Sequence, residues 1–195
     1  MSPFEIAANA ITTLAIFLAA RNSVHTWWLG IIGSLIFIVV FYQAKLYADA
    51  SLQFFFIVTS LIGWRLWLSR HSAPDVKIQR TNVRTLLWMS LAAVLVTAVY
   101  GSLLHYFTDA YAPYVDSAVL GFSVMAQLLL MQRRIENWWV WIVVNTLSVP
   151  LFASRELYLT AGLYAIYWFN AWYGMWHWSR QMRGTPDKIV SNASA

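Results

Sequence analysis

The chain has 195 residues, of which 60% are hydrophobic and 11% charged, and its formal net charge is +5 at pH 7. Soluble domains carry about 25% charged residues, so this composition excludes a disordered chain and argues against a water-soluble domain. The chain contains no cysteine, which rules out disulfides, Cys-ligated metals and a Cys nucleophile. Its length fits an integral membrane protein with roughly six to eight spans, because each span needs about 20 residues.

Seven apolar runs follow one another along the chain, and each predicts a transmembrane helix. They cover roughly residues 4–20, 27–44, 50–69, 85–107, 117–132, 138–153 and 157–178. A helix satisfies its backbone amides internally, as lipid requires, and the runs lack the alternation typical of a β-barrel. No basic segment precedes the first run, so we expect it to be a retained span rather than a cleaved signal.

Basic residues concentrate in alternate loops. With seven spans, one side receives the first, third and fifth loops and the C-terminus. That side holds Arg21, Arg70, Lys77, Arg80, Arg84, Arg133, Arg134, Arg180, Arg183 and Lys188. Lys45 and Arg155 lie on the other side, and Arg65 lies inside the third run. This bias predicts an outside N-terminus and a cytoplasmic C-terminus, and it explains the net charge without nucleic-acid binding. Residues 181–195 are polar and predict a disordered cytoplasmic tail.

Sliding the sequence along itself gives one register, at a constant offset of 111 residues, with ten identities in the 41 positions 27–67. The identities include Trp27 with Trp138, Trp28 with Trp139, Gly63 with Gly174, and Trp67 with Trp178. Two parallel three-helix repeats, at about 4–69 and 117–178, would need one extra helix between them, and the run at about 85–107 supplies it. We therefore predict an all-α membrane protein with a 3+1+3 arrangement, forming a single domain over residues 1–180. A chance match between two aromatic hairpins is the alternative.

The most informative polar face lies in the sixth run. Trp138, Trp141 and Asn145 are spaced i, i+3 and i+7, so they share one helical face with Asn145 near mid-membrane. A buried amide in lipid needs a partner, which marks a helix contact or a wet cavity. Further candidates on other runs are Gln53, Gln127, Tyr164, Tyr167 and Asn170. Such a lining suits a planar, hydrogen-bonding ligand that is not anionic, and Trp faces attract cationic rings.

Each candidate also has a simpler explanation. Six tryptophans lie near span ends, and most of these six are expected in the interfacial belt: Trp27, Trp28, Trp138, Trp139, Trp176 and Trp178. Asn145 is explained about equally well by a hydrogen bond between helices. Pro150, deep in the sixth run, predicts either a hinge for alternating access or a static bend. The four His residues show no metal-ligand spacing, and no metal, cofactor or catalytic residue is predicted.

The stretch ENWWVWIVVN, from Glu136 to Asn145, resembles the W-x-x-W-x-x-x-N motif of the PnuC-type vitamin transporters. Trp138, Trp141 and Asn145 occupy the motif positions. In the first half, FYQAKLY at 41–47 and the segments that follow it, with Gln53 and residues 63–67, are also similar to the family. The resemblance covers about residues 25–180.

Two departures from the family pattern are visible. The counterparts of Trp141 and Asn145 in the first half are Gly30 and Ser34, so we expect an asymmetric site built mainly by the second half. The N-terminal segment is shorter than the extended one of some members.

The resemblance implies a transporter with the 3+1+3 plan of the SWEET sugar transporters, working by facilitated diffusion as a homotrimer in the bacterial inner membrane. The best-known members carry nicotinamide riboside, which kinases trap inside the cell, and relatives carry thiamine or riboflavin. The absence of basic residues at the proposed site argues against a phosphorylated nucleotide. Nicotinamide riboside and thiamine both carry a cationic ring, so the sequence leaves both open.

Other classes of membrane protein fit less well. A retinal Schiff base would need a mid-membrane lysine, and the three lysines lie outside the spans or at their ends. An intramembrane enzyme would need paired carboxylates, a Ser/His pair or metal ligands within the spans. A proton-coupled pump would need a mid-span acid, so we expect a uniporter.

Overall fold

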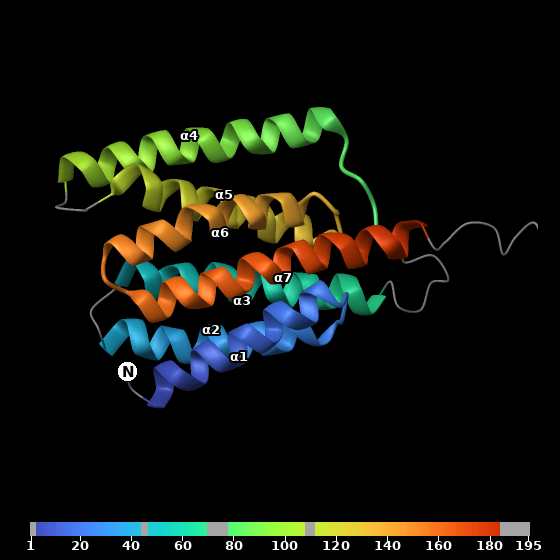
Figure 1. Ribbon diagram of the computed structural model, residues 1–195, viewed down its shortest axis with the longest axis horizontal. Helices are drawn as coiled ribbons and strands as arrows, with labels where there is room; N and C mark the ends of the chain where they lie inside the picture. Colours follow the sequence, from blue (N-terminus) through green and yellow to red (C-terminus); the bar gives the residue numbers. More distant parts are fainter. Residues whose placement is uncertain (1–2, 44–46, 70–77, 108–111, 184–195) are drawn as a thin grey trace, which may run out of the picture.

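The structure is a computed structural model that describes residues 3–43, 47–69, 78–107 and 112–183, which form seven α-helices. They are α1 (Pro3–Ala20), α2 (His25–Gln43), α3 (Tyr47–Ser69), α4 (Val83–Phe107), α5 (Pro113–Met131), α6 (Asn137–Ser154) and α7 (Tyr158–Arg183). Consecutive helices run in opposite directions along one long axis (Figure 1). The seven runs expected to be helical are thereby confirmed as helices.

The largest difference from expectation is the length of α7, which continues to Arg183 instead of ending near residue 178. Arg180 and Arg183 lie in its last turn, where positive charge interacts favourably with the helix dipole. Residues 184–195, most of the expected tail, lie outside the described residues, as do Lys45, Arg70 and Lys77.

Four of the described helices are long and apolar enough to cross a membrane: α1, α3 from Leu52 onward, α4 and α5. α2 is apolar over the shorter stretch His25–Val40. α6 and α7 are richer in Trp, Tyr, Asn and other polar residues, which lower hydropathy but are common where spans meet the interface or one another.

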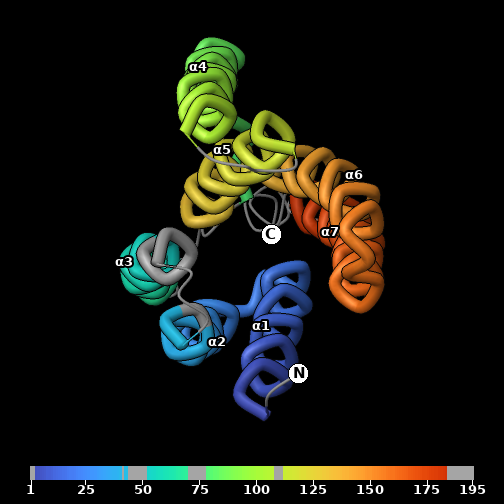
Figure 2. The backbone as a smooth tube through the Cα atoms, turned by 90° about the vertical axis from the view of Figure 1, so that its left-hand side faces the viewer, coloured from blue at the N-terminus to red at the C-terminus, as the bar shows by residue number. Residues whose placement is uncertain are grey.

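Six helices are arranged around a common axis, and α4 lies outside them. α1, α2 and α3 pack in chain order, as do α5, α6 and α7. Contacts of α3 with α5 and of α7 with α1 close the ring, and α4 packs against α5 (Figure 2). The two trios therefore meet along two seams, α3–α5 and α1–α7.

The two trios share a turn motif at the offset of 111. Asn22 follows α1 with φ 55°, and its counterpart Arg133 follows α5 with the same φ. The amides of residues 22 and 23 donate to the carbonyls of Ala19 and Leu18, each at 2.9 Å, and residues 133 and 134 repeat the pattern one offset later. This pair of backbone hydrogen bonds, with a residue in the left-handed conformation, caps the C-terminus of each helix.

The segment preceding α4 is fixed to the turn between α5 and α6. The Gln79 amide donates to the Arg133 carbonyl at 3.1 Å, and the Ile135 amide donates to the Gln79 carbonyl at 3.0 Å. A carboxylate oxygen of Glu136 accepts from the amide and the hydroxyl of Thr81, at 3.0 and 2.8 Å. These bonds place Ile78 inside the hydrophobic core.

The tryptophans near helix ends divide into two groups. Trp28, Trp139 and Trp176 are exposed on the bundle surface, where an interfacial belt would lie. Trp27, Trp138 and Trp178 are no more than 2% exposed, so the belt interpretation is wrong for them. They belong to a buried cluster at the end where α1, α3, α5 and α7 terminate.

Candidate functional site

Asn145 lies halfway along α6 and is only 3% exposed. Its side-chain amide makes no hydrogen bond to another residue among those the structure describes. An amide can donate two hydrogen bonds and accept two, so Asn145 has hydrogen-bonding capacity that the described residues do not use. Asn145 is therefore a group available to a ligand.

Trp141 and Trp138 share the face of α6 that carries Asn145, but they have different surroundings. Trp138 is buried at the start of α6, where its ring meets Trp178 at 5.4 Å and leaves no room for a side chain at Gly174. Trp141 is half-buried and touches both hydrophobic clusters, one at the helix ends and one between α4, α5 and α6. Of the two rings, Trp141 lies closer in sequence to Asn145 and is less deeply buried.

The predicted polar residues of α7 meet α1. The Tyr167 hydroxyl and the Thr13 hydroxyl lie 2.7 Å apart, and the Asn170 amide donates to the Ile16 carbonyl at 3.1 Å. Asn170 is 4% exposed, so this bond is inside the bundle. Tyr167 and Asn170 thus hold the α1–α7 seam together at mid-helix.

The other predicted site residues are less tightly assembled. Tyr164 stacks on Phe152 of α6 at 5.0 Å and meets Tyr167 edge-on at 5.7 Å. Gln127 of α5 and Gln53 of α3 are half-buried. The structure brings Tyr164 and Tyr167 together on α7, with Asn170 one turn further on, whereas no hydrogen bond joins either Gln to these residues in the described part of the chain.

Sequence reasoning missed several buried hydroxyls. Thr13, the partner of Tyr167, gave no signal of its own because the Thr12–Thr13 pair in an apolar run is unremarkable. Ser34 and Thr59 are buried at the positions that match Asn145 and Asn170 at the offset of 111, and Ser60 is buried beside Thr59. The repeat register already gave Ser34 as the counterpart of Asn145, and the same register could have identified Thr59 as the counterpart of Asn170. Thr59 bonds within its own helix, to the carbonyls of Phe55 and Phe56.

The middle layer of the described helices carries no formal charge. Every Asp, Glu, Lys or Arg in these helices lies within the five residues nearest a helix end. Asp116 at the start of α5 pairs with Arg155 at the end of α6 at 2.5 Å. Within the described residues there is also no group of three His, Asp or Glu side chains that could hold a metal ion.

Two hollows on the surface are separate from these residues. One, of about 270 Å³, lies between α4, α5 and α6 and is lined by Leu86, Ser90, Phe122, Met125, Glu136, Trp139, Val140 and Val143. The other, of about 340 Å³, lies on the outside of α3 around Trp64 and Arg65. Neither is lined by a predicted site residue.

Pro150 lies within α6, which continues through it to Ser154. Because proline has no backbone N–H, one intrahelical hydrogen bond is missing in the half of α6 that follows Asn145. The hinge assigned to Pro150 stays a prediction.

Comparisons with known proteins agree on one family. A family model described as nicotinamide mononucleotide transporter matches residues 2–180. The nicotinamide riboside transporter PnuC of Escherichia coli (strain K12) is 26% identical, with 98% of this chain and 91% of that protein covered. PnuC of Neisseria mucosa is 28% identical, with 87% and 69% covered. The riboflavin/roseoflavin transporter RibM of Streptomyces davaonensis is 23% identical, with 98% and 91% covered.

A solved structure is similar as well. The crystal structure of the vitamin B3 transporter PnuC matches with a TM-score of 0.72 and 25% identity, covering 91% of this chain and 80% of that chain. The resemblance carried by the motif in α6 is thereby confirmed. From the match over residues 2–180, this chain belongs to the nicotinamide mononucleotide transporter family.

Proposed function

We propose that the protein moves nicotinamide riboside into the cell by facilitated diffusion, with intracellular phosphorylation trapping the substrate. Two relatives are named as nicotinamide riboside transporters, which supports this substrate class. The compound has a cationic pyridinium ring, a carboxamide and a ribose, and it has no phosphate. Aromatic faces suit the ring, and amide side chains suit the carboxamide and hydroxyls.

The observation that carries the proposal is the buried amide of Asn145, which has no hydrogen-bond partner among the described residues and lies beside the half-buried Trp141. In the proposed site, Asn170, Tyr164 and Tyr167 of the neighbouring helix α7 would join it, with Gln127, Gln53 and Trp138 completing the set. The substrate would form the hydrogen bonds that Asn145 lacks in the packed state.

The charge of the middle layer favours a nucleoside over a nucleotide. Phosphate recognition relies on Arg or Lys, and the described helices carry neither near Asn145. We therefore propose the riboside, although the family description names the mononucleotide.

A flavin or thiamine is the second candidate. RibM, a relative over nearly the whole chain, is named for riboflavin and roseoflavin. The planar ring system of a flavin also suits an aromatic and amide lining. Thiamine has a cationic ring and meets the same physical criteria. A transporter is favoured over an intramembrane enzyme because the middle layer offers no carboxylate pair or metal ligands for catalysis.

For the architecture, we propose seven spans in two parallel three-helix repeats, α1–α3 and α5–α7, joined by α4 in the manner of the SWEET transporters. The matched turns at Asn22 and Arg133 support this symmetry, as does the pairing of the two trios along two seams. Residues 1–180 would then form one transmembrane domain.

We also propose that the N-terminus is outside and the C-terminus cytoplasmic, in the bacterial inner membrane. Of the described basic residues in loops and helix ends, Arg21, Arg80, Arg84, Arg133, Arg134, Arg180 and Arg183 lie at one end of the bundle, here called the basic end. Arg155 lies at the opposite end. This asymmetry supports a cytoplasmic basic end. A homotrimer is the expected assembly, on the family resemblance alone.

A thermal-shift panel on the purified protein tests the substrate. Nicotinamide riboside, nicotinamide mononucleotide, thiamine and riboflavin would each be added over a concentration series. A ligand at 100 times its Kd stabilises the protein by about 2.7 kcal/mol. We expect the riboside to raise the Tm and the mononucleotide, its phosphorylated match, to leave it unchanged. A shift with riboflavin or thiamine alone would replace the proposed substrate, and a larger shift with the mononucleotide would contradict the charge argument.

A further inference from the structure

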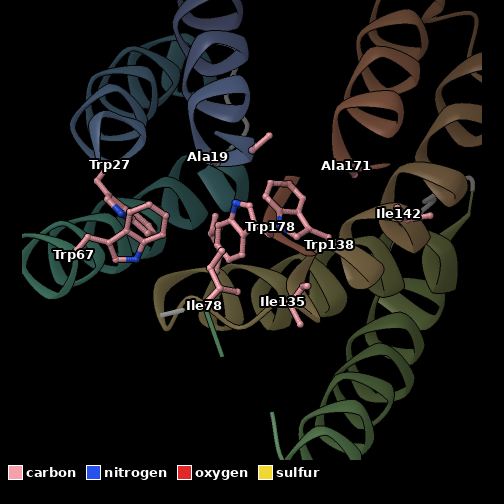
Figure 3. Packing of buried hydrophobic residues seen from close by; sticks show 11 residues of the cluster. Ala19, Trp27, Trp67, Ile78, Ile135, Trp138, Ile142, Ala171 and Trp178 are labelled. Carbon is pink, nitrogen blue, oxygen red and sulfur yellow. The ribbon is translucent and has the colours of Figure 1, made fainter. Parts of the chain in front are cut away.

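Four tryptophans meet at the basic end of the bundle: Trp27 of α2, Trp67 of α3, Trp138 of α6 and Trp178 of α7. This tryptophan quartet is buried, with each side chain no more than 2% exposed (Figure 3). The substrate site proposed above uses only Trp138 among them.

The quartet consists of two matched pairs. Trp27 meets Trp67 edge-on at 5.2 Å within the first trio, and Trp138 meets Trp178 edge-on at 5.4 Å within the second. Each pair is backed by a glycine of the same trio, because a Cβ at Gly63 would lie 2.6 Å from Trp27 and one at Gly174 would lie 2.7 Å from Trp138. Each pair is therefore packed tightly into its own half of the molecule.

The two pairs meet across the ring. α3 and α7 are not packed as neighbouring helices in the described bundle, yet the rings of Trp67 and Trp178 approach to 6.2 Å. Ile78, from the segment fixed under α5 and α6, belongs to the same cluster. The quartet and Ile78 thus fill the centre of the ring at the basic end.

Not all of the indole N–H groups of the quartet have a hydrogen-bond partner within the described residues. The Trp67 indole N–H donates to the Met131 carbonyl at 3.1 Å. The indole N–H groups of Trp27, Trp138 and Trp178 are buried and have no hydrogen-bond partner within the described residues. Buried donors without partners are disfavoured, and a movement that admitted water would satisfy all three.

We propose that the tryptophan quartet is the gate that closes the substrate path at the basic end. It opens when the Trp27–Trp67 pair and the Trp138–Trp178 pair separate as two units, and hydration of the three indole N–H groups offsets the loss of ring contacts. This inference rests on the proposed transport function.

Besides the bond from Trp67 to Met131, two contacts tie the halves together at this gate. The Arg133 guanidinium, from the second half, lies 4.2 Å from the ring centre of Trp67 in the first half. On the other seam, the Asn22 side-chain amide donates to the Gln181 side chain at 3.0 Å, at an exposed position. The first contact stabilises the closed gate by a cation–π interaction, and the second offers a place to lock it.

Cross-linking tests whether separation is needed for transport. The natural chain has no cysteine, so the double variant Asn22→Cys/Gln181→Cys can be tied by a short, reducible bifunctional thiol reagent. The matched control, Asp116→Cys/Arg155→Cys, ties two elements within the second half at the opposite end. In proteoliposomes we expect nicotinamide riboside uptake to fall at least tenfold in the first variant, to recover on reduction, and to change less than twofold in the control. Unchanged uptake in a fully cross-linked first variant would overturn the gate.

A second measurement needs no substrate, so it separates failure of the gate from failure of the proposed function. Because Ile78 is buried in the same cluster, the thiol of Ile78→Cys should react with a bulky water-soluble maleimide only when the quartet separates. The variant Arg80→Cys, at an exposed position, gives the reference rate of labelling. Adding Arg133→Gln should accelerate labelling at position 78 by about 2- to 30-fold, the range of a cation–π contact.

The neighbouring Arg134 supplies the control for this labelling. Its guanidinium donates to the Arg80 carbonyl at 2.9 Å and holds the segment before α4, not the quartet. Equal acceleration by Arg134→Gln would mean that labelling reports detachment of the segment before α4. No acceleration by Arg133→Gln would mean that the cluster is a static core. Either result overturns the proposal. The expected labelling pattern without riboside uptake would retain the gate and refute the proposed substrate.

Discussion

At the scale of single residues, identical side chains on one helix face have different tasks because of what lies opposite them. The spacing of Trp138, Trp141 and Asn145 predicted a shared face, and α6 presents them in that register. Spacing could not predict that Trp138 would be enclosed by Gly174 and Trp178, because those residues lie more than 30 positions away in the sequence. It also could not find Thr13, whose role depends on Tyr167 of a distant helix.

Replacing Asn145 distinguishes a ligand-binding amide from one that joins helices. Asn145→Ala should weaken riboside binding by about 5- to 150-fold, the equivalent of one or two lost hydrogen bonds at about 1–3 kcal/mol. The Tm should change little, because the amide makes no bond to the described residues that the variant would lose. Calorimetry gives the affinity and a melting curve gives the Tm. A large fall in Tm with unchanged affinity would identify Asn145 as structural.

Trp141→Ala has a close control in Trp139→Ala. Trp141 is half-buried beside the amide, whereas Trp139 is 53% exposed on the opposite side of α6. We expect at least a tenfold weaker Kd for the first variant, because stacking on a cationic ring is lost, and less than a twofold change for the second. Similar effects of the two substitutions would remove Trp141 from the site.

At the scale of helices, hydropathy located all seven elements because lipid-facing segments need long apolar runs, and these are local properties of sequence. The ends were less predictable. α5 begins at Pro113, earlier than expected, because Pro is favourable in the first turn of a helix, and α7 continues through two arginines that suit its last turn.

Helix contacts inside each trio depend on glycine, and α7 contains both a test and its control. Gly174→Ala places a Cβ 2.7 Å from the Trp138 ring, so it should destabilise the protein by about 1–3 kcal/mol. Gly162→Ala, in the same helix, would place its Cβ with nothing within 4 Å apart from the adjacent turns of α7 itself. It should be neutral or stabilise by up to about 1 kcal/mol, since Ala is the better helix former. Melting curves in detergent compare the two, and equal stabilities would contradict the packing described here.

At the scale of the whole molecule, the repeat register predicted which residues are equivalent but not where the two halves touch. The seams α1–α7 and α3–α5 join segments far apart in sequence, and no local pattern encodes such contacts. The seams also differ: α1–α7 is hydrogen-bonded at mid-helix through Tyr167 and Asn170, whereas α3–α5 is bonded at the basic end through Trp67. This asymmetry arises because the two halves share helix positions but not the polar residues at them.

The charge distribution of the whole bundle leads to a prediction about energetics. Coupling to protons requires a group that titrates within the membrane, and the acids of the described helices lie near their ends, with Asp116 paired to Arg155. Riboside uptake into proteoliposomes should therefore follow the concentration gradient, stop when the inside and outside concentrations are equal, and persist in the presence of a protonophore. An enclosed kinase with ATP should raise total accumulation by converting the riboside to a phosphate that cannot leave. Accumulation above the outside concentration without the kinase, or its collapse on adding the protonophore, would demonstrate a coupled pump instead of a uniporter.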